Sequence, residues 1–150
     1  MNQAAVLFVC LGNICRSPAA EGVLRALLPG EEIDSAGTSD WHIGDPPYGP
    51  MIAAARARGY DIAAFRARQF RAADFARFDL ILAMDAKNLA DIEALRPSGS
   101  TTEVRLFAPF AGTGETEVLD PYYTRDFDGA LMLIERAGEG LRAALSAWPD

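Results

Sequence analysis

Two cysteines, an arginine and a serine lie close together in the run Cys10–Pro18, which reads Cys-Leu-Gly-Asn-Ile-Cys-Arg-Ser-Pro. A helix that begins after such a loop presents unpaired N–H groups and a partial positive charge, so the loop can bind an anion. Arg16 can bring two parallel N–H groups to two oxygens of one phosphate. Cys10 would lie at the base of that cradle, where the helix end and Arg16 stabilise a nucleophilic thiolate. The run therefore predicts a phosphate-binding loop with a nucleophile at its base.

Gly12 and Asn13 are the residues expected to shape this loop, because both types tolerate positive φ and let successive N–H groups point inward. The Lys-Ser or Lys-Thr of a Walker A loop and the three spaced glycines of a dinucleotide fingerprint are both missing. Four residues separate Cys10 from Cys15, which is not the spacing of the Cys-x-x-Cys redox motif. A buried, structural Cys10 beside a surface Arg16 is the alternative interpretation. The combination of residue types in one loop argues against it.

The loop lies between an expected strand and an expected helix. Ala4–Val9 is a continuous apolar run, typical of a strand buried on both faces of a parallel sheet. Ser17 and Pro18 offer a capping hydroxyl and a first-turn proline, and Pro29-Gly30 ends that helix. Further strands are expected near residues 32–36, 80–84 and 104–107, and further helices over 51–58, 86–95 and 130–145. This alternation predicts a single α/β domain whose ligand crevice lies at the carboxyl ends of a mostly parallel sheet.

Composition narrows the class of partner. The chain has 150 residues, of which 14 are Lys or Arg and 21 are Asp or Glu, so its formal net charge is −7. Such a chain lacks the broad basic face that nucleic-acid binding needs. Its apolar runs are too short for a membrane span, and no positive residue precedes the first of them as in a signal peptide. One histidine and two cysteines cannot supply the usual zinc ligands. We expect a cytoplasmic protein that binds no nucleic acid and is a monomer or weak dimer.

Several segments, in order along the chain, resemble the low-molecular-weight protein-tyrosine phosphatase family. The run Val9–Pro18 resembles that family's phosphate loop throughout. The later segments are Asp34–Thr38 with Trp41-His42, Ala67–Gln69 with Phe78–Asp85, and Asp120–Tyr123, the last of which resembles the family's general-acid loop. The fold that this resemblance implies is a three-layer α/β sandwich with a central four-stranded parallel sheet of order 2-1-3-4, flanked by helices.

The resemblance implies protein-tyrosine phosphatase activity and a role for each catalytic residue. Cys10 would attack phosphorus and form a cysteinyl-phosphate intermediate, while Arg16 clamps the equatorial oxygens. Ser17 would donate a hydrogen bond to the Cys10 sulfur. Asp120 would protonate the departing phenolate, which leaves poorly as an anion because tyrosine has a pKa of about 10, and would then act as base toward water. Asp-Pro alone is an ordinary turn pair, so this role depends on the Cys10 loop. No metal or organic cofactor is implied, since the loop and Arg16 supply the positive charge.

The resemblance also implies a substrate slot. The loop residues that would line it are Leu11, Gly12, Asn13, Ile14 and Cys15, with Ser35 supporting Asn13. Trp41, Tyr122 and Tyr123 would wall a slot deep enough for phosphotyrosine, so that shorter phosphoserine would not reach the nucleophile, and His42 would lie at the rim. Core packing is an equal alternative for Trp41. The expected partner is a phosphotyrosine-containing protein, with a tyrosine kinase as a second partner that would phosphorylate Tyr122 and Tyr123.

Cys15 is expected to protect Cys10 from irreversible oxidation. A neighbouring thiol can trap an oxidised cysteine as a reversible disulfide before it reaches the sulfinic acid. The alternative is that Cys15 is a packed loop residue.

The chain departs from the family pattern at three places. Phe65 stands where the family commonly has a histidine that helps to hold the loop asparagine, so Asn13 is expected to depend on Ser35. Tyr48-Gly49 replaces a more usual acidic residue, and the segment after Tyr123 is short. These departures bear on substrate preference rather than on the chemistry.

Other functions use a similar loop. Thioredoxin-coupled arsenate reductases need further cysteines downstream, and none follows Cys15. Phosphoarginine phosphatases carry threonine where this chain has Ile14 and lack the paired tyrosines, and they are the first alternative. A catalytically quiet anion-binding or redox-sensing module is the second, against which the presence of both a nucleophile and Asp120 argues.

Overall fold

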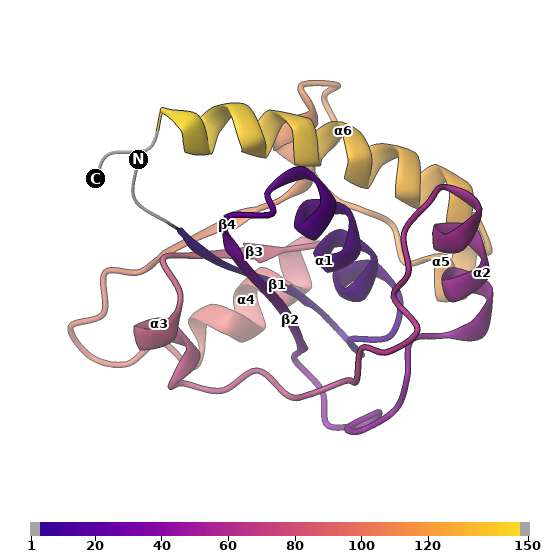
Figure 1. Ribbon diagram of the computed structural model, residues 1–150. Helices are drawn as coiled ribbons and strands as arrows, with labels where there is room; N and C mark the ends of the chain where they lie inside the picture. The colour runs from indigo at the N-terminus through magenta and orange to yellow at the C-terminus, as the bar shows by residue number, and fades with distance from the viewer. Residues whose placement is uncertain (1–3, 148–150) are drawn as a thin grey trace.

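Four parallel strands form the sheet at the centre of the protein (Figure 1). The computed structural model describes residues 4–147. The strands are β1 (Ala5–Cys10), β2 (Glu32–Gly37), β3 (Leu80–Ala83) and β4 (Glu103–Leu106). Their spatial order is β2-β1-β3-β4, and each neighbouring pair is parallel. This order confirms the expected sheet and brings the carboxyl ends of β1 and β3 side by side.

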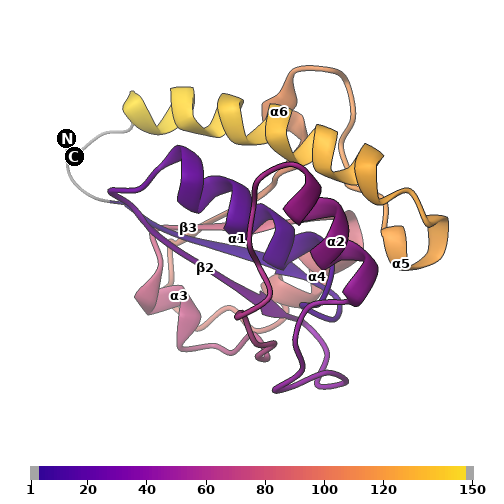
Figure 2. The same ribbon diagram turned by 45° about the vertical axis from the view of Figure 1, so that its right-hand side comes forward.

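Helices cover both faces of the sheet and complete the three layers (Figures 1 and 2). One face carries α1 (Arg16–Leu27) and α6 (Phe127–Ser146), which pack against each other. The other face carries α3 (Asp74–Arg77) and α4 (Ala86–Glu93). The remaining helices are α2 (Gly49–Ala57), the 3-10 helix η1 (Ala108–Ala111) and α5 (Pro121–Thr124). Both views place α2 and α5 at the end of the molecule where α6 begins.

Alternate residues of β1 feed two apolar cores, because successive side chains of a strand point to opposite faces. Val6 and Phe8 pack in the core shared with α1 and α6, where the rings of Phe8 and Phe107 meet edge to face with 5.0 Å between centroids. Leu7 and Val9 pack in the second core, on the face of α3 and α4. With neither face open to solvent, β1 holds its carboxyl end in a fixed place.

The first helix begins differently from the sequence-based expectation. Ser17 was the expected N-cap, but α1 begins at Arg16, the residue at the cap position is Cys15, and no side chain caps this end. Ser17 lies inside the first turn, where its hydroxyl bonds to the loop instead. The short helices α3, η1 and α5 were not expected, because four residues are too few to display a helical period.

A close backbone approach joins η1 to α6. Gly140 lies within α6, and a Cβ at this position would overlap the carbonyl oxygen of Phe110 in η1. Glycine in a helix interior costs about 1 kcal/mol relative to alanine. Here the missing side chain allows the contact that fixes the segment following β4.

Residues 4–147 contain neither a membrane-spanning helix nor a cluster of metal-ligating side chains. No helix there is both long and apolar enough to cross a membrane. Within the same residues, no three His, Cys, Asp or Glu side chains come together as a metal ion would require.

Candidate active site

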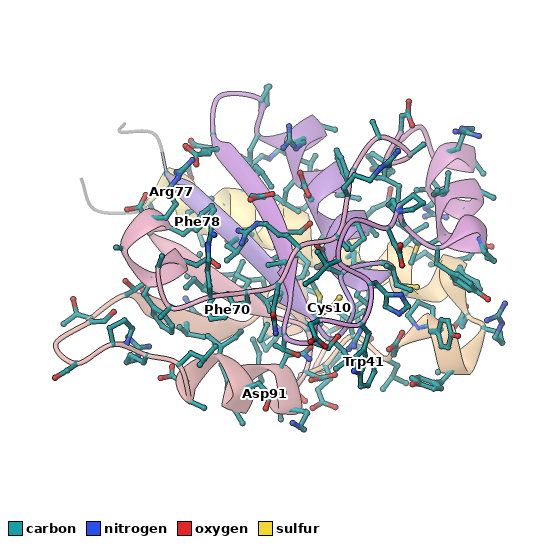
Figure 3. The ribbon with its side chains drawn as sticks, turned by 90° about the horizontal axis from the view of Figure 1, so that it is seen from below. Cys10, Trp41, Phe70, Arg77, Phe78 and Asp91 are labelled. Atoms are coloured by element: carbon teal, nitrogen blue, oxygen red, sulfur yellow. The ribbon has the colours of Figure 1, made fainter. Side chains whose placement is uncertain are left out.

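The predicted phosphate loop lies at the carboxyl end of the central strand β1 (Figure 3). Cys10 is the last residue of β1 and α1 begins at Arg16, so the chain passes through the loop directly from strand to helix. Figure 3 shows Trp41 near Cys10 at this end of the sheet, whereas Arg77 and Phe78 lie toward the other end. The loop therefore faces the positive end of α1, where an anion is stabilised.

Gly37, at the end of β2, allows the neighbouring strand to lie directly behind the loop. It pairs with Cys10 in the register of the sheet. A Cβ at position 37 would lie 2.9 Å from the carbonyl oxygen of Leu11 and 3.0 Å from the carbonyl carbon of Gly12. Only glycine avoids this overlap with backbone atoms.

Asn13 supplies the left-handed residue of the loop, with φ of 57°. The prediction that Gly12 also adopts positive φ is wrong, because the positive-φ glycines among the described residues lie elsewhere. Glycine at position 12 instead leaves room for the His42 ring, since a Cβ there would lie 3.0 Å from Cδ2 of His42. Asparagine tolerates the left-handed region because its short polar side chain can bond locally.

The Asn13 side chain is fully hydrogen-bonded. Its Nδ2 donates to Ser17 Oγ at 2.8 Å and to Ser35 Oγ at 3.0 Å. Its Oδ1 accepts from the backbone N–H of Arg68 at 3.0 Å. Phe65 takes no part in this network and packs against the apolar core. Asn13 thus depends on Ser35, as expected, and the loop is held without the histidine usual in the family.

The direction of these bonds leaves the Ser17 proton available for Cys10. Because Ser17 Oγ accepts from Asn13, its own hydrogen can go to a second acceptor. Cys10 Sγ lies 3.0 Å from Ser17 Oγ, closer than the Ala36 carbonyl oxygen at 3.4 Å. The backbone N–H of Asn13 also donates to the sulfur, at 3.3 Å. Two donors therefore converge on Cys10 Sγ from inside the loop.

Buried Glu21 ends this chain of hydrogen bonds. Its Oε1 accepts from Ser35 Oγ at 2.7 Å and its Oε2 accepts from Arg25 Nε at 2.9 Å. Burial raises the pKa of the Glu21 carboxyl, and nearby Asp34 raises it further, although Ser35 and Arg25 act in the opposite direction. The carboxyl group of Glu21, a buried residue of α1, is thereby linked to the residues that hold the phosphate loop.

Two carboxylates and a carbonyl orient the Arg16 side chain, which is 3% exposed. Its Nη1 donates to Asp85 Oδ2 at 2.7 Å and to the Val118 carbonyl at 3.0 Å, and its Nη2 to Asp120 Oδ2 at 3.4 Å. Burial would lower the pKa of Arg16, but Cys10, Asp85 and Asp120 outweigh it and the pKa is raised. The buried Nε finds no partner among the described residues. A guanidinium fixed along one side with a free Nε is suited to an anion.

A pocket of about 210 Å³ opens over Cys10 and Arg16. It is lined by Cys10, Leu11, Gly12, Ile14, Cys15, Arg16, Trp41, His42, Asp120, Tyr122 and Tyr123. Asp120 is fixed here by accepting the backbone N–H of Tyr122 at 3.0 Å, which makes it the N-cap of α5. One pocket therefore contains a thiol, a guanidinium and a carboxyl group.

The aromatic residues lie at the mouth of this pocket. Trp41 is 66% exposed and Tyr123 is 70% exposed. For Trp41 this exposure decides between the two interpretations, because a tryptophan packed in the core would be covered. Tyr122 is partly covered, with its ring packed against that of Tyr123 at 5.3 Å between centroids.

The remaining predicted residues have different surroundings. Burial, together with the charges of Cys10 and Asp120, raises the pKa of the Cys15 thiol to about 12, so Cys15 is protonated at neutral pH. His42 lines the pocket, and its Nδ1 lies 3.2 Å from Asp45 Oδ2. Asn13 was expected to contact substrate, yet its side chain is buried behind the loop rather than in the pocket wall.

Sequence reasoning missed Asp85 and Glu21. Asp85 follows β3 directly, and the carboxyl ends of parallel strands are where ligands bind in such sheets. That placement was the signal that could have identified it. Glu21 carries no comparable signal, because its burial depends on how α1 packs over β2.

Comparisons with known proteins agree with the geometry of the site. The family model described as low molecular weight phosphotyrosine protein phosphatase matches residues 5–148. The chain is 45% identical to a putative low molecular weight protein-tyrosine-phosphatase of Synechocystis sp., covering 93% of this chain and 95% of that one. The crystal structure of YfkJ from Bacillus subtilis superposes with a TM-score of 0.91 at 35% identity, covering 98% and 97% of the two chains. Vibrio vulnificus Wzb in complex with benzylphosphonate gives 0.85 at 29% identity, covering 95% and 99%.

A four-stranded parallel sheet flanked by helices, with a cysteine–arginine loop at the carboxyl end of an inner strand, places the chain in the class of α/β proteins. Within that class, the chain belongs to the low molecular weight phosphotyrosine protein phosphatase family.

Proposed function

We propose that the protein hydrolyses phosphotyrosine in proteins through a cysteinyl-phosphate intermediate. The observation that carries the proposal is the convergence of three groups on one pocket. Cys10 Sγ lies at its base with two hydrogen-bond donors, Arg16 is held by Asp85, and Asp120 lies at the opening of α5. A pocket that only bound an anion would need neither the nucleophile nor the acid.

In the first step the Cys10 thiolate attacks phosphorus and forms the S–P bond as the P–O bond to the aryl group breaks. Asp120 gives its proton to the departing phenolate oxygen, which would otherwise leave as a basic anion. Arg16 and the loop N–H groups bind the equatorial oxygens and stabilise the charge on them.

In the second step a water molecule attacks phosphorus and transfers a proton to the Asp120 carboxylate. The S–P bond breaks, inorganic phosphate leaves and the Cys10 thiolate is restored. The hydrogen bond from Ser17 to the sulfur favours this step, because it stabilises the negative charge that returns to Cys10.

The pocket wall supports an aryl phosphate as the substrate class. Exposed aromatic rings at the mouth can stack on a phenyl ring, and apolar Ile14 lines the wall below them. Similarity to Wzb, whose structure holds benzylphosphonate, supports a ligand that carries both an aromatic ring and a phosphorus oxyanion.

The decisive experiment compares the parent with Cys10→Ser and Asp120→Asn on phenyl phosphate, whose leaving group needs a proton. We expect Cys10→Ser to be inactive. Asp120→Asn retains the cap of α5 but not the acid, and its kcat/KM should fall about 100-fold or more. An inactive parent, or a fully active Cys10→Ser variant, would refute the proposed chemistry. Phosphotyrosine, phosphoserine and phosphoarginine peptides then test specificity, and preference for phosphoarginine would favour the alternative substrate.

Redox protection by Cys15 is a further part of the proposal. Peroxide would convert the Cys10 thiolate to a sulfenic acid, and the Cys15 thiol would displace water from it to form a disulfide. Both cysteines are buried free thiols of the same loop. A Cys15→Ser variant should recover less activity than the parent when peroxide treatment is followed by a thiol reductant. Equal recovery would refute the protective role.

A further inference from the structure

Tyr48, the residue at the N-cap position of α2, contacts the segment Asp120–Phe127 through its side chain. This segment carries the proposed general acid and is called the general-acid segment below. Figures 1 and 2 both place α2 and α5 together at the end of the molecule where α6 begins. The Tyr48 ring packs against Tyr122 with 5.1 Å between centroids and against Phe127 at 6.1 Å. Its hydroxyl accepts a hydrogen bond from Arg125 Nη1 at 3.1 Å. These contacts hold both ends of the short segment that begins with Asp120.

Tyr48 is also tied to the phosphate loop. Its backbone N–H donates to the carbonyl of Ile14 at 2.8 Å. The same residue therefore contacts the loop that carries Cys10 through its backbone and the segment that carries Asp120 through its side chain. Those two segments are more than 100 positions apart in the chain, and their separation in space determines how far the acid lies from the reacting phosphorus.

Arg125 adopts a backbone conformation that its residue type disfavours. It has φ of 64°, and among the described non-glycine residues only Asn13 shares a positive φ. The position is the C-cap of α5, where glycine is ordinarily preferred. Its guanidinium lies over the rings of Tyr48 and Phe127, at 5.4 and 5.1 Å from their centroids, and also donates to the Tyr122 carbonyl at 3.2 Å. The side-chain contacts thus accompany a strained backbone at the end of the general-acid segment.

We propose that Tyr48 and Arg125 are positioning residues that hold Asp120 at a fixed place over Cys10. This inference rests on the proposed function, in which Asp120 protonates the leaving group. Neither residue touches the reacting atoms. Together they fix a one-turn helix that has few other contacts, because three of its four residues are exposed.

The experiment uses the dependence of kcat/KM on the leaving group. Proton donation matters for phenyl phosphate, whose leaving group is as basic as tyrosine, and much less for 4-nitrophenyl phosphate, whose leaving group is stable as an anion. A displaced Asp120 should therefore lower kcat/KM selectively for phenyl phosphate. We expect a loss of about tenfold for Tyr48→Ala and about threefold for Tyr48→Phe, with less than twofold change on 4-nitrophenyl phosphate.

Tyr60→Phe is the matched control. The Tyr60 hydroxyl donates to Glu135 Oε2 at 2.7 Å and joins the chain after α2 to α6, outside the pocket. Its removal should leave both substrates within twofold of the parent. Equal losses on the two substrates in Tyr48→Ala would indicate general structural damage and overturn the proposal, as would behaviour identical to that of Tyr60→Phe.

The Arg125→Gly variant distinguishes an effect on the placement of Asp120 from an effect on the stability of the fold. Glycine relieves the left-handed strain, so the variant should unfold at the parent temperature or above it, while the contact with Tyr48 is lost. The selective loss on phenyl phosphate should persist, and unchanged selectivity would overturn the role of Arg125. A parent inactive on both substrates would refute the proposed function itself, whereas an active parent with unselective variants would refute only the positioning role.

Discussion

At the scale of single residues, Asp85 performs two tasks with its two oxygens. Oδ2 accepts from Arg16 and Oδ1 accepts the backbone N–H of Asn88, which caps α4. The ion pair is largely shielded from water because the guanidinium is buried. A charge in such surroundings loses much of its stabilisation when its partner is neutralised.

Asp85→Asn tests the first task without disturbing the second, since asparagine is also a good helix cap. In Asp85→Asn the ion pair that holds Arg16 is lost. If this loss costs about 2 kcal/mol of transition-state stabilisation, kcat/KM falls roughly 30-fold. Steady-state kinetics on an aryl phosphate provide the measurement. Asp91→Asn, which breaks an exposed ion pair with Lys87 in the same helix, is the control and should stay within twofold. Similar kinetics for the two variants would mean that Asp85 only caps the helix.

At the scale of elements, the carboxyl end of β2 supports the phosphate loop from behind. Gly37→Ala would press a methyl group against the backbone of Leu11 and Gly12, which cannot move without moving Cys10. We expect a loss of about 1–3 kcal/mol in the free energy of unfolding, as in other overpacked sites, and a parallel loss of activity. Urea denaturation and kcat/KM measure the two effects.

Gly30→Ala is the comparison for this substitution. A Cβ there meets no atom within 4 Å and the backbone φ is not positive, so the change should be neutral or slightly stabilising. If the two variants unfolded at the same urea concentration, the close approach behind the loop would carry no energetic weight.

The elements also show what the sequence could and could not predict. Apolar runs such as Leu80–Met84 and helical spacing identified the sheet and the longer helices, because burial imposes those patterns. The one-turn α5 leaves no such pattern, and its position depends on the contact of Tyr122 with Tyr48, which is distant in the chain. The Ser17-Pro18 signal predicted a helix start in the right region, but the hydroxyl bonds to Cys10 instead of capping a backbone N–H of the helix. The local preference for a serine N-cap was therefore outweighed by the hydrogen bond between Ser17 and Cys10 in the site.

At the scale of the whole molecule, Glu21 makes stability depend on pH. Its folded-state pKa is raised, chiefly by burial, so the folded protein binds this proton more tightly than the unfolded chain does. Stability linked to the group is therefore present at low pH and is lost as pH rises from about 4, the usual carboxyl range, through the raised folded-state pKa. The carboxyl is nevertheless tied to the phosphate loop through Ser35.

Glu21→Gln removes the titration while keeping a carbonyl oxygen that can accept from Ser35. The free energy of unfolding of the parent, minus that of the variant, should decrease as pH rises from about 4 to 7. Urea denaturation at several pH values measures this difference. Parallel curves for the two proteins across that interval would show that the Glu21 pKa is not raised by folding.

The candidate site follows from sequence only as far as its contiguous part. Cys10, Arg16 and Ser17 occupy one loop, so their proximity is fixed by the chain itself. Asp120 and Asp85 reach Arg16 only through the folded sheet, and their distances are set by packing that no single sequence segment encodes. The resemblance to a family placed Asp120, whereas the position of Asp85 after the expected strand 80–84 indicated a ligand-binding edge but not its contact with Arg16.

The contact between η1 and α6 at Gly140 bears on how mutational tolerance should be interpreted. Any side chain at position 140 would displace the backbone of Phe110. In a library that varies every position and selects for phosphatase activity, glycine would be retained here as strictly as in the phosphate loop. Substitutions at position 140 would abolish activity because the fold is lost, not because the chemistry is lost. Selection for activity alone would therefore not distinguish structural positions such as Gly140 from the residues of the phosphate loop.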